Sequence, residues 1–417
     1  MGILSALIER RSEKWVSDDS WYSGLLNSIT KAGVRVTESN AMQFLTVYAC
    51  NKILANTIAA VPLELYRYTG SEDREKAKTH PLYKITRRLA NPEMSASQFK
   101  RTLQGHLGTW GNAFSYKEYD RAGRVVGLWP MLPDRVLIQR NAETGKLEYP
   151  YFKNNKWEIL TSKQVWHIPA FGFDGITGYS PVGMARNAVG LGMAMEEFNA
   201  RFYANGAKPG AILQHPQHLS VDAQKRLTDK IMENTGGIEK SWNLLVLEEG
   251  MTLNAFGMKL VDAEFLASRK FTQSQIAGEM YQIPLHMIGN LDRATFSNIE
   301  NQQLEYHTDT MLAWYTIWQD EAYRGLLSER EQEEYFFEFN PNMLIRGDLK
   351  SRYEAYSIGR NNGVLSVDDI NRMENKNSIG KAAGGDVRLA PLNYIPLEDY
   401  ANGNYKTQGK RIADKTE

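Results

Sequence analysis

The sequence predicts an α+β fold, in which helices pack on a mostly antiparallel sheet. Three observations predict it. Apolar residues recur at helical spacing before residue 112 and again after residue 180. Between these regions, apolar residues alternate with a period of two, as in strands with one buried face. The first two of these strands flank Asp120-Arg121-Ala122-Gly123, which indicates an antiparallel hairpin.

The composition is that of an ordinary soluble globular protein. The chain has 417 residues, of which 42% are apolar and 24% charged, and this length predicts two to three domains. A net charge of zero gives no overall electrostatic reason to expect nucleic-acid binding. Residues 1–179 hold 24 basic and 17 acidic groups, whereas residues 180–328 hold 12 and 17. The central region is therefore the acidic part.

Compartment and membrane signals are few. Cys50 is the only cysteine, which excludes an intrachain disulfide and a cysteine-rich metal site and fits a reducing cytoplasm. The N-terminus places Arg10 and Arg11 after its apolar residues, the reverse of a secretory signal. No window approaches 18 uninterrupted apolar residues, so we expect no membrane span.

The first 179 residues carry the predicted sheet. Residues 1–38 are expected to be weakly structured, and Asn40 is expected to cap a helix that ends near Ala60. Two further helices are predicted to begin near His80 and at Ser97. His167, in the last strand, is interpreted as a structural histidine of the sheet. The predicted strands of this region are 63–68, 113–119, 124–129, 136–140, 147–152 and 164–168.

The central region opens with a long helix from Ser180 to about Asn205. Ser180 is a favourable N-cap, and Pro181 suits the first helical position. The helix is apolar almost all round, and it contains Gly183, Gly190 and Gly192. Each glycine within a helix costs about 1 kcal/mol relative to alanine, so a packing reason is expected. Two interpretations stay open: a core helix of one large subunit, or a helix packed between copies in an oligomer.

A compact insert, 208–259, interrupts the helices. Its pattern predicts a strand at 211–214, a helix at 220–234 and a strand at 244–248. A second helix is predicted at 262–282 and a third at 296–327, about 45–50 Å long if unbroken.

The stretch that joins these two helices, Ile283 to Thr295, is longer than helix–helix connections usually are. It is apolar and contains one acidic and one basic residue. It is interpreted either as a buried crossover or as a functional projection.

The rest of the chain is short elements and a tail. Tyr335 to Phe339 alternates as one more strand, which is expected to return to the sheet of the first region. A helix follows at 348–360, and Ser366 with Asp369 resembles a capping box. The last twenty or so residues are expected to be disordered.

Motifs for catalysis are weak. Ser180 lacks the G-x-S-x-G spacing of a nucleophile elbow and is interpreted as the helix cap. His215 and His218 have the spacing of two metal ligands, but nothing near them in the sequence supplies the others. No phosphate-cradling G-x-x-x-x-G-K-[ST] loop occurs. We therefore expect no catalytic residue, no metal and no cofactor.

Several short stretches, taken in order, resemble one family. They are Gly178-Tyr179-Ser180-Pro181, Arg201-Phe202-Tyr203-Ala204-Asn205-Gly206, Leu247-Glu248-Glu249-Gly250, Ile283-Pro284 with Met287-Ile288-Gly289, Arg293-Ala294-Thr295-Phe296-Ser297-Asn298-Ile299-Glu300, and Arg346-Gly347-Asp348-Leu349. This order of stretches, over about residues 40–375, resembles the portal, or head–tail connector, proteins of tailed double-stranded DNA bacteriophages, in the branch found in long-tailed phages and prophages.

The resemblance implies how the chain is divided. It implies a portal-like ring subunit with a wing, a helical stem, an α/β clip, a tunnel loop and a small helical crown. The implied parts are a weakly ordered N-terminus (1–38), the wing (39–179, completed by 298–342), stem helices (180–207 and 261–282), the clip (208–260), the tunnel loop (283–297), a long wing helix (298–328), the crown (343–375) and a flexible tail (376–417).

The resemblance also implies a function. Such proteins form a ring, usually of twelve subunits, at one capsid vertex, and double-stranded DNA passes through its channel during packaging and ejection without sequence specificity. The implied partners are the terminase large subunit, the head–tail adaptor and the major capsid protein. The implied location is the virion, with assembly in the host cytoplasm. No enzymatic activity and no membrane contact are implied.

The resemblance assigns roles to a few residues. The tunnel loop would present His286, Met287, Asn290, Arg293, Thr295 and Phe296 to DNA. Gly183, Gly190 and Gly192 would serve stem packing, and Glu248 and Glu249 the docking rim of the clip. Two rival classes of protein fit the sequence less well. One is a cytoplasmic hydrolase that uses Ser180 or a histidine, but no nucleophile–base–orienter set can be assembled from the sequence. The other is a membrane-inserting ring toxin, but the sequence shows no amphipathic hairpin.

Overall fold

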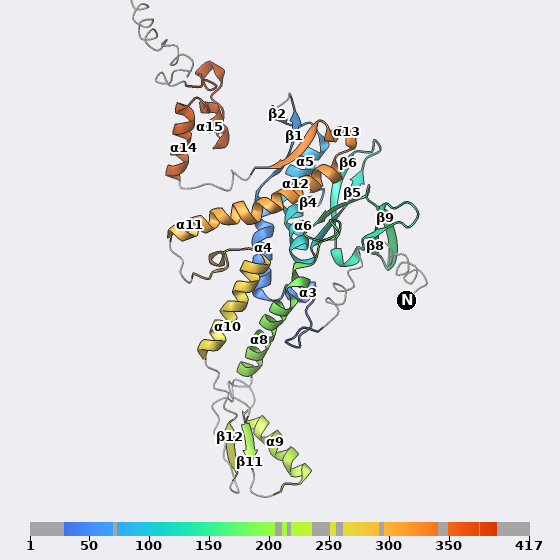
Figure 1. Ribbon diagram of the computed structural model, residues 1–417, viewed down its shortest axis with the longest axis vertical. Coiled ribbons are helices and arrows are strands. Elements are labelled where there is room, and N and C mark those ends of the chain that lie inside the picture. Colours follow the sequence, from blue (N-terminus) through green and yellow to red (C-terminus); the bar gives the residue numbers. More distant parts are fainter. Residues whose placement is uncertain are drawn as a thin grey trace, which may run out of the picture. The chain divides into compact units, whose positions relative to one another are not determined.

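A computed structural model describes residues 29–69, 73–204, 211–214, 218–235, 251–255, 262–291, 296–340, 349–374 and 376–389. The chain divides into two compact units, Met1–Asn340 and Pro341–Glu417. The first is shown with its helices and strands in Figure 1.

Two helices form the centre of the first unit: α4 (Leu45–Ala60) and α6 (Ala96–Trp110) pack against each other. Their facing side chains are apolar and fully buried, among them Leu54, Ile58, Leu103 and Leu107. The side chain of Ser95 caps α6, and Gly111 ends it in the left-handed conformation that glycine favours. The predicted helix at 97–110 is thereby confirmed.

The start of the first predicted helix was wrong. A separate turn, α3 (Glu38–Ala41), precedes α4, and Thr37 rather than Asn40 is its N-cap. The Asn40 side chain instead accepts a 2.7 Å hydrogen bond from the backbone N–H of Thr37, which completes a capping box. A sequence pattern that fits a cap at two nearby positions does not reveal which one the chain uses.

The strands form small antiparallel sheets on these helices. The sheet orders are β13-β1-β2, β10-β5-β6, β7-β8-β9, β3-β4 and β11-β12. The strands of the first unit are β1 (Leu63–Tyr68), β2 (Arg74–Lys76), β3 (Leu89–Asn91), β4 (Met94–Ser95), β5 (Asn112–Tyr119), β6 (Val125–Met131), β7 (Gln139–Arg140), β8 (Leu147–Lys153), β9 (Lys156–Thr161), β10 (Val165–Pro169), β11 (Ala211–Gln214), β12 (Thr252–Ala255) and β13 (Tyr335–Phe339).

The α+β prediction and the predicted return strand are confirmed. Strand β13 pairs with β1 so that Leu63 faces Phe339, which closes a sheet between residues far apart in the sequence. Two of the sheets pack face to face over a core of Phe114, Met131, Val136, Tyr149, Leu160 and Val165. Short helices complete this region: α5 (Pro81–Arg87), the 3₁₀ turn η1 (Pro133–Arg135) and α13 (Glu329–Gln332).

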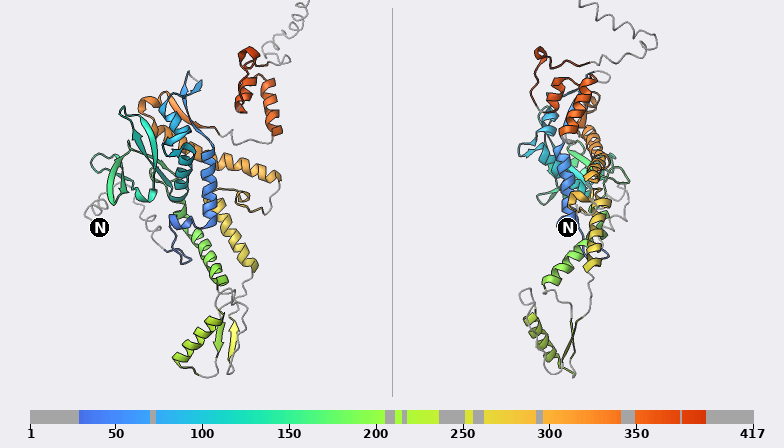
Figure 2. Two further views of the ribbon diagram at one scale, coloured as in Figure 1. Left: turned by 180° about the vertical axis from the view of Figure 1, so that it is seen from behind. Right: turned by 90° about the vertical axis from the view of Figure 1, so that its left-hand side faces the viewer.

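The long helix predicted from Ser180 is two helices. α7 (Pro181–Met184) ends at Ala185, and α8 (Arg186–Ala204) follows. The predicted cap is confirmed, because the Ser180 hydroxyl accepts a 2.9 Å hydrogen bond from the Gly183 N–H. α8 lies beside α10 (Asp262–Ser274), as Figures 1 and 2 show.

The second and third predicted helices each contain a π-helical segment. α10 continues into η2 (Gln275–Met280), and α11 (Phe296–Glu305) continues through η4 (Tyr306–Met311) into α12 (Leu312–Leu326). Between them lies a short 3₁₀ turn, η3 (Leu285–Ile288). A π segment changes the hydrogen-bond register and not the pattern of apolar residues over a few turns, so the sequence predicted unbroken helices.

The insert is described in part. β11 and the helix α9 (Val221–Thr235) confirm two predicted elements. The partner of β11 is β12, at Thr252–Ala255. The strand predicted at 244–248, and with it Glu248 and Glu249, lies outside the described residues.

The second unit contains α14 (Leu349–Asn361), α15 (Val367–Met373) and the 3₁₀ turn η6 (Lys381–Ala383). The predicted capping box is confirmed, because Ser366 and Asp369 exchange side-chain to backbone hydrogen bonds of 3.0 and 3.1 Å. The Asp368 carboxylate accepts from the N–H groups of Ile379 and Gly380, which ties the chain after α15 to the start of that helix.

Candidate functional site

One side of α8 packs within its own chain. A Cβ added at Gly190 would lie 2.8 Å from Thr30, and one at Gly192 would lie 2.6 Å from Phe44. The close approach that these two glycines permit is therefore an intrachain one. Gly183 is buried and lies in the capped first turn of α7. A role of the three glycines in contacts between copies remains a prediction.

The other side of α7 and α8 is an exposed apolar stripe. Met184, Leu191 and Phe198 recur every seven residues and are 49%, 40% and 44% exposed. Seven residues make almost two helical turns, so Leu191 and Phe198 lie on one face of α8. Met184 of α7 borders the same cavity as Leu191. We call these three residues the α8 stripe. One face of the helix is therefore core, as one of the two interpretations of its sequence has it, and the other face carries partly exposed apolar side chains.

The described part of the candidate tunnel segment is folded rather than extended. Pro284 leads into η3, and Gly289 ends the turn with a φ of +86°. His286, Met287 and Asn290 are half-buried. Nδ1 of His286 lies 2.8 Å from the side-chain oxygen of Gln302, which joins the turn to α11. Arg293 and Thr295 lie outside the described residues, and Phe296 is the first residue of α11.

The described part of this segment has almost no charged side chains. Between Pro284 and Leu291, His286 is the one side chain that can carry a charge. A surface of this kind can contact a polyanion without the tight, salt-sensitive binding that rows of lysine and arginine create.

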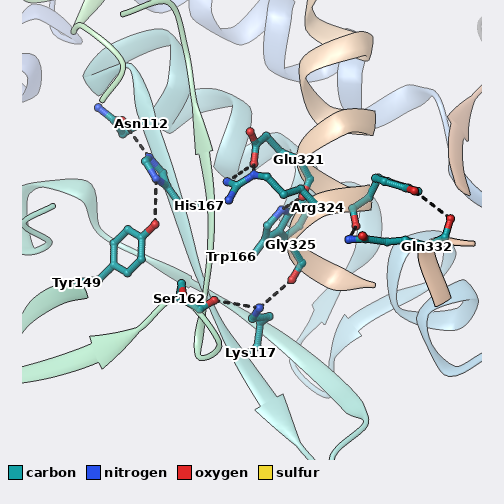
Figure 3. Close-up of polar contacts among 11 residues, drawn as sticks. Asn112, Lys117, Tyr149, Ser162, Trp166, His167, Glu321, Arg324, Gly325 and Gln332 are labelled. Carbon is teal, nitrogen blue, oxygen red and sulfur yellow. Dashed lines mark hydrogen bonds and ion pairs between the residues drawn. The ribbon is translucent and has the colours of Figure 1, made fainter. Parts of the chain in front are cut away.

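The far end of the helical rod is fixed to a sheet. Lys117 of β5 donates hydrogen bonds to the carbonyl oxygens of Gly325 (2.7 Å) and Ser162 (3.3 Å), as Figure 3 shows. Nε1 of Trp166 in β10 donates to the carbonyl of Glu321 at 2.9 Å. The Gly325 carbonyl is one of the last four of α12, which have no partner within the helix, so Lys117 satisfies it. The bond from Trp166 to the Glu321 carbonyl adds a second attachment of the same helix. Burial, aided by the nearby Arg324, lowers the pKa of Lys117 to about 8.

A glycine makes this anchorage possible. A Cβ at Gly325 would lie 2.5 Å from the Trp166 ring, so any other residue would displace the indole. Trp318, about two turns before Gly325 in α12, donates a 2.8 Å hydrogen bond to Gln104 of α6. α12 is therefore held by both the sheet and the central helices.

His167 has the structural role that its sequence position predicted. Its Nε2 lies 3.0 Å from Oδ1 of Asn112, and its Nδ1 lies 3.4 Å from the Tyr149 hydroxyl (Figure 3). The Asn112 oxygen also accepts from the Gly178 N–H, so Nε2 of His167 is the protonated nitrogen. Burial lowers the pKa of His167 to about 3, which keeps the ring neutral.

Ser180 is likewise structural. Its hydroxyl donates to the Thr109 carbonyl at 2.7 Å while it accepts from Gly183, and the residue is buried. Of the candidate metal ligands, His218 is exposed and close to the Leu219 carbonyl, and His215 lies outside the described residues. In the part of the chain that the structure describes, no three His, Cys, Asp or Glu side chains converge on a metal-sized site. Within the same residues, no helix combines the length and hydrophobicity that crossing a membrane requires.

Sequence reasoning missed two features. Asn112 and Lys117 occupy ordinary strand positions in the sequence. Only the fold shows that Asn112 binds the backbone of Gly178 and that Lys117 binds the Gly325 carbonyl at the end of α12. Phe171 and Phe173 were also missed, although the signal was visible: two phenylalanines separated by a glycine, with further glycines at 175 and 178.

Comparison with known proteins agrees with the resemblance. A family model described as phage portal protein matches residues 45–375. The portal protein of Enterobacteria phage HK97 is 27% identical over 367 residues, which are 87% of this chain and 85% of that protein.

Two solved structures share the fold. One is the crystal structure of an HK97 family phage portal protein from Corynebacterium diphtheriae, with a TM-score of 0.55 and 13% identity over 75% of this chain and 97% of that one. The other is a chain from the neck of an empty gene transfer agent particle, with a TM-score of 0.57 and 18% identity over 82% of this chain and 94% of that one.

Proposed function

The chain belongs to the phage portal protein family, and we propose that its copies form a ring, of twelve subunits, at one vertex of the capsid. Double-stranded DNA passes through the channel of this ring when the head is filled and when the genome is ejected. The family is structural rather than enzymatic. The ring acts in the virus particle, and it assembles in the host cytoplasm.

The α8 stripe is the observation on which the proposal of a ring rests. Three large apolar side chains along α7 and α8, each at least 40% exposed, place apolar surface in water that a neighbouring subunit would cover. A ring supplies that surface on every subunit, because each copy contacts a neighbour on either side. We assign 180–207 and 261–282 to the stem on this basis.

The folded turn at Pro284–Leu291 supports a channel role. Met287 and Asn290 are half-buried, and the turn is linked to α11 through His286 and Gln302. Residues 283–297 would form the tunnel loop, with Arg293, Thr295 and Phe296 in its second half. The neutral character of the described half suits a lining along which DNA slides.

The remaining parts follow from the family. Residues 39–179 with 298–342 make the wing, which faces the major capsid protein. The insert, 208–260, is the clip, and we propose that it docks the terminase large subunit and later the head–tail adaptor, with Glu248 and Glu249 on its rim. Residues 343–375 would form the crown, and residues 376–417, which follow in the sequence, the tail.

Electron microscopy of the purified protein tests the proposal. Negatively stained particles are expected to be rings with a central hole. Compact particles without a hole, at concentrations where the protein is folded, would contradict it.

A further inference from the structure

The loop between β10 and α7 presents two phenylalanine side chains to solvent. Phe171 and Phe173 are each 74% exposed, more than any other aromatic side chain among the described residues. Their rings meet edge to face with centroids 5.9 Å apart, and Phe173 meets Tyr179 in the same way at 5.4 Å. We call the pair Phe171 and Phe173 the aromatic knob.

The backbone under the aromatic knob is held firmly. The Asn112 side chain accepts from the N–H of Gly178 at 2.9 Å and donates to its carbonyl at 2.7 Å. The Tyr179 N–H donates to the Phe171 carbonyl at 2.9 Å, so the two ends of the loop are paired. Within the loop, Oδ1 of Asp174 accepts from two backbone N–H groups. These bonds fix the loop in one conformation.

This conformation requires glycine at two positions of the loop. A Cβ at Gly172 would lie 1.8 Å from the Thr177 carbonyl oxygen, and one at Gly178 would lie 2.0 Å from the Gly111 carbonyl oxygen. The loop is therefore ordered, and it exposes two apolar rings to water. A rigid, exposed aromatic pair is the form that an interface anchor takes, since its ordering is complete before binding.

A groove on the same unit could receive such an anchor. It has a volume of about 500 Å³, and its walls include Met184, Ala188 and Leu191 of α7 and α8. The alanine leaves room between two larger side chains that belong to the α8 stripe. The groove is open and close in the sequence to the aromatic knob; its wall on α7 and α8 is largely apolar, and Lys31, Asn187 and Gln275 complete its lining.

We propose that the aromatic knob of one subunit occupies the α8 groove of the next subunit in the ring. Closed rings use heterologous contacts, in which one patch of a chain meets a different, complementary patch of its neighbour. Because neighbours in a ring differ by a rotation about the axis, two patches that touch must lie at the same height along it. The aromatic knob and the groove lie on either side of Ser180 in the sequence, which is consistent with that condition. This inference rests on the proposed ring.

Cysteine cross-linking between differently substituted subunits tests the contact. Cys50 is buried, and burial raises the pKa of its thiol to about 12, so the native cysteine does not compete for reagent. Subunits with Phe173→Cys and subunits with Leu191→Cys are mixed, assembled and treated with a short bis-maleimide. The expected product is a covalent dimer that contains one of each. Ile159→Cys in β9 replaces Phe173→Cys in the control, which should give no such dimer.

Light scattering before the reagent is added separates the two claims. Absence of rings in the unsubstituted protein contradicts the proposed function. Intact rings without the mixed dimer, or with as much mixed dimer in the Ile159→Cys control, overturn the contact.

A second variant guards against loss of assembly by the cysteines. Phe171→Ser with Phe173→Ser should raise the concentration needed for ring formation about tenfold or more, since two exposed rings per interface are lost, while the melting temperature of the subunit stays the same. Rings that form at the original concentration would overturn the contact.

Discussion

The side-chain amine of Lys117 donates a 2.7 Å hydrogen bond to the backbone carbonyl of Gly325 and so joins strand β5 to the C-terminal end of α12. The indole of Trp166 fixes the same helix one turn earlier. Because α11, η4 and α12 are continuous, one end of this helical element is held by β5 and β10, and the other end contacts the turn η3 through His286 and Gln302. A single helical element therefore connects this sheet to the turn that we propose to line the channel.

Lys117 should make the stability of the protein rise in mild alkali. The pKa of its amine is about 8 in the folded chain and 10.5 ordinarily, so between these values the unfolded state binds the extra proton. The free energy of unfolding then increases with pH by up to about 1.4 kcal/mol per unit. Lys117→Met should remove this increment, as measured by urea unfolding at pH 8, 9 and 10. Lys163→Met, at an exposed position of the same region, is the control, and equal slopes in all three proteins would contradict the account.

His106 should contribute to acid instability. It is buried, its Nδ1 has no hydrogen-bond partner among the described residues, and burial lowers its pKa to about 4. Between pH 4 and 6.5 the unfolded state binds a proton that the folded state does not, so stability falls as the pH falls. His106→Leu should reduce the loss between pH 6 and 5 by about 1 kcal/mol in urea unfolding. An unchanged loss would show that the buried ring is not responsible.

Gly192 should be required for the packing of α8 within its own chain. In Gly192→Ala the new Cβ would lie 2.6 Å from the buried Phe44 ring, and overpacking of this kind costs about 1–3 kcal/mol. Gly105→Ala in α6 meets no atom within 4 Å and should instead stabilise the helix by about 0.5–1 kcal/mol. Thermal unfolding of the two variants should therefore shift in opposite directions. A neutral Gly192→Ala would show that α8 can move away from Phe44.

These glycines show where sequence reasoning ends. The residues predicted that something approaches α8 closely, but periodicity contains no information about whether that neighbour belongs to the same chain. The strand at Tyr335–Phe339 and the cap at Ser180 were predictable, because alternation and N-capping are local signals. The break at Ala185 and the π segments η2 and η4 were not, because tertiary packing decides them.

The α8 stripe should be needed for assembly and not for folding. Leu191→Ser with Phe198→Ser changes two apolar side chains that are 40% and 44% exposed and are not among the buried core residues. Light scattering should show a subunit of 47.4 kDa where the unsubstituted protein shows a ring, with the same circular dichroism spectrum. The matched control is Ile159→Ser, at an exposed apolar position of β9. Rings of normal size and stability in the double variant would remove the stripe from the interface.

The turn at η3 should govern the passage of DNA. Met287→Lys adds one positive charge per subunit to a segment that has almost none, so phosphate contacts should slow packaging, and more so at low salt. Packaging into otherwise normal heads is the assay, and ring assembly should not change. Val126→Lys adds the same charge to an exposed position of β6 and should have no effect. Equal packaging rates at every salt concentration would place η3 away from DNA.

A focused cryo-electron microscopy reconstruction of one vertex in DNA-filled particles tests the central claim most directly. We expect a ring of this chain at that vertex, DNA density along its axis, and the turn at Pro284–Leu291 as the protein density nearest to the DNA. A vertex ring built from another protein, or an axial channel lined by a different part of this chain, would contradict it.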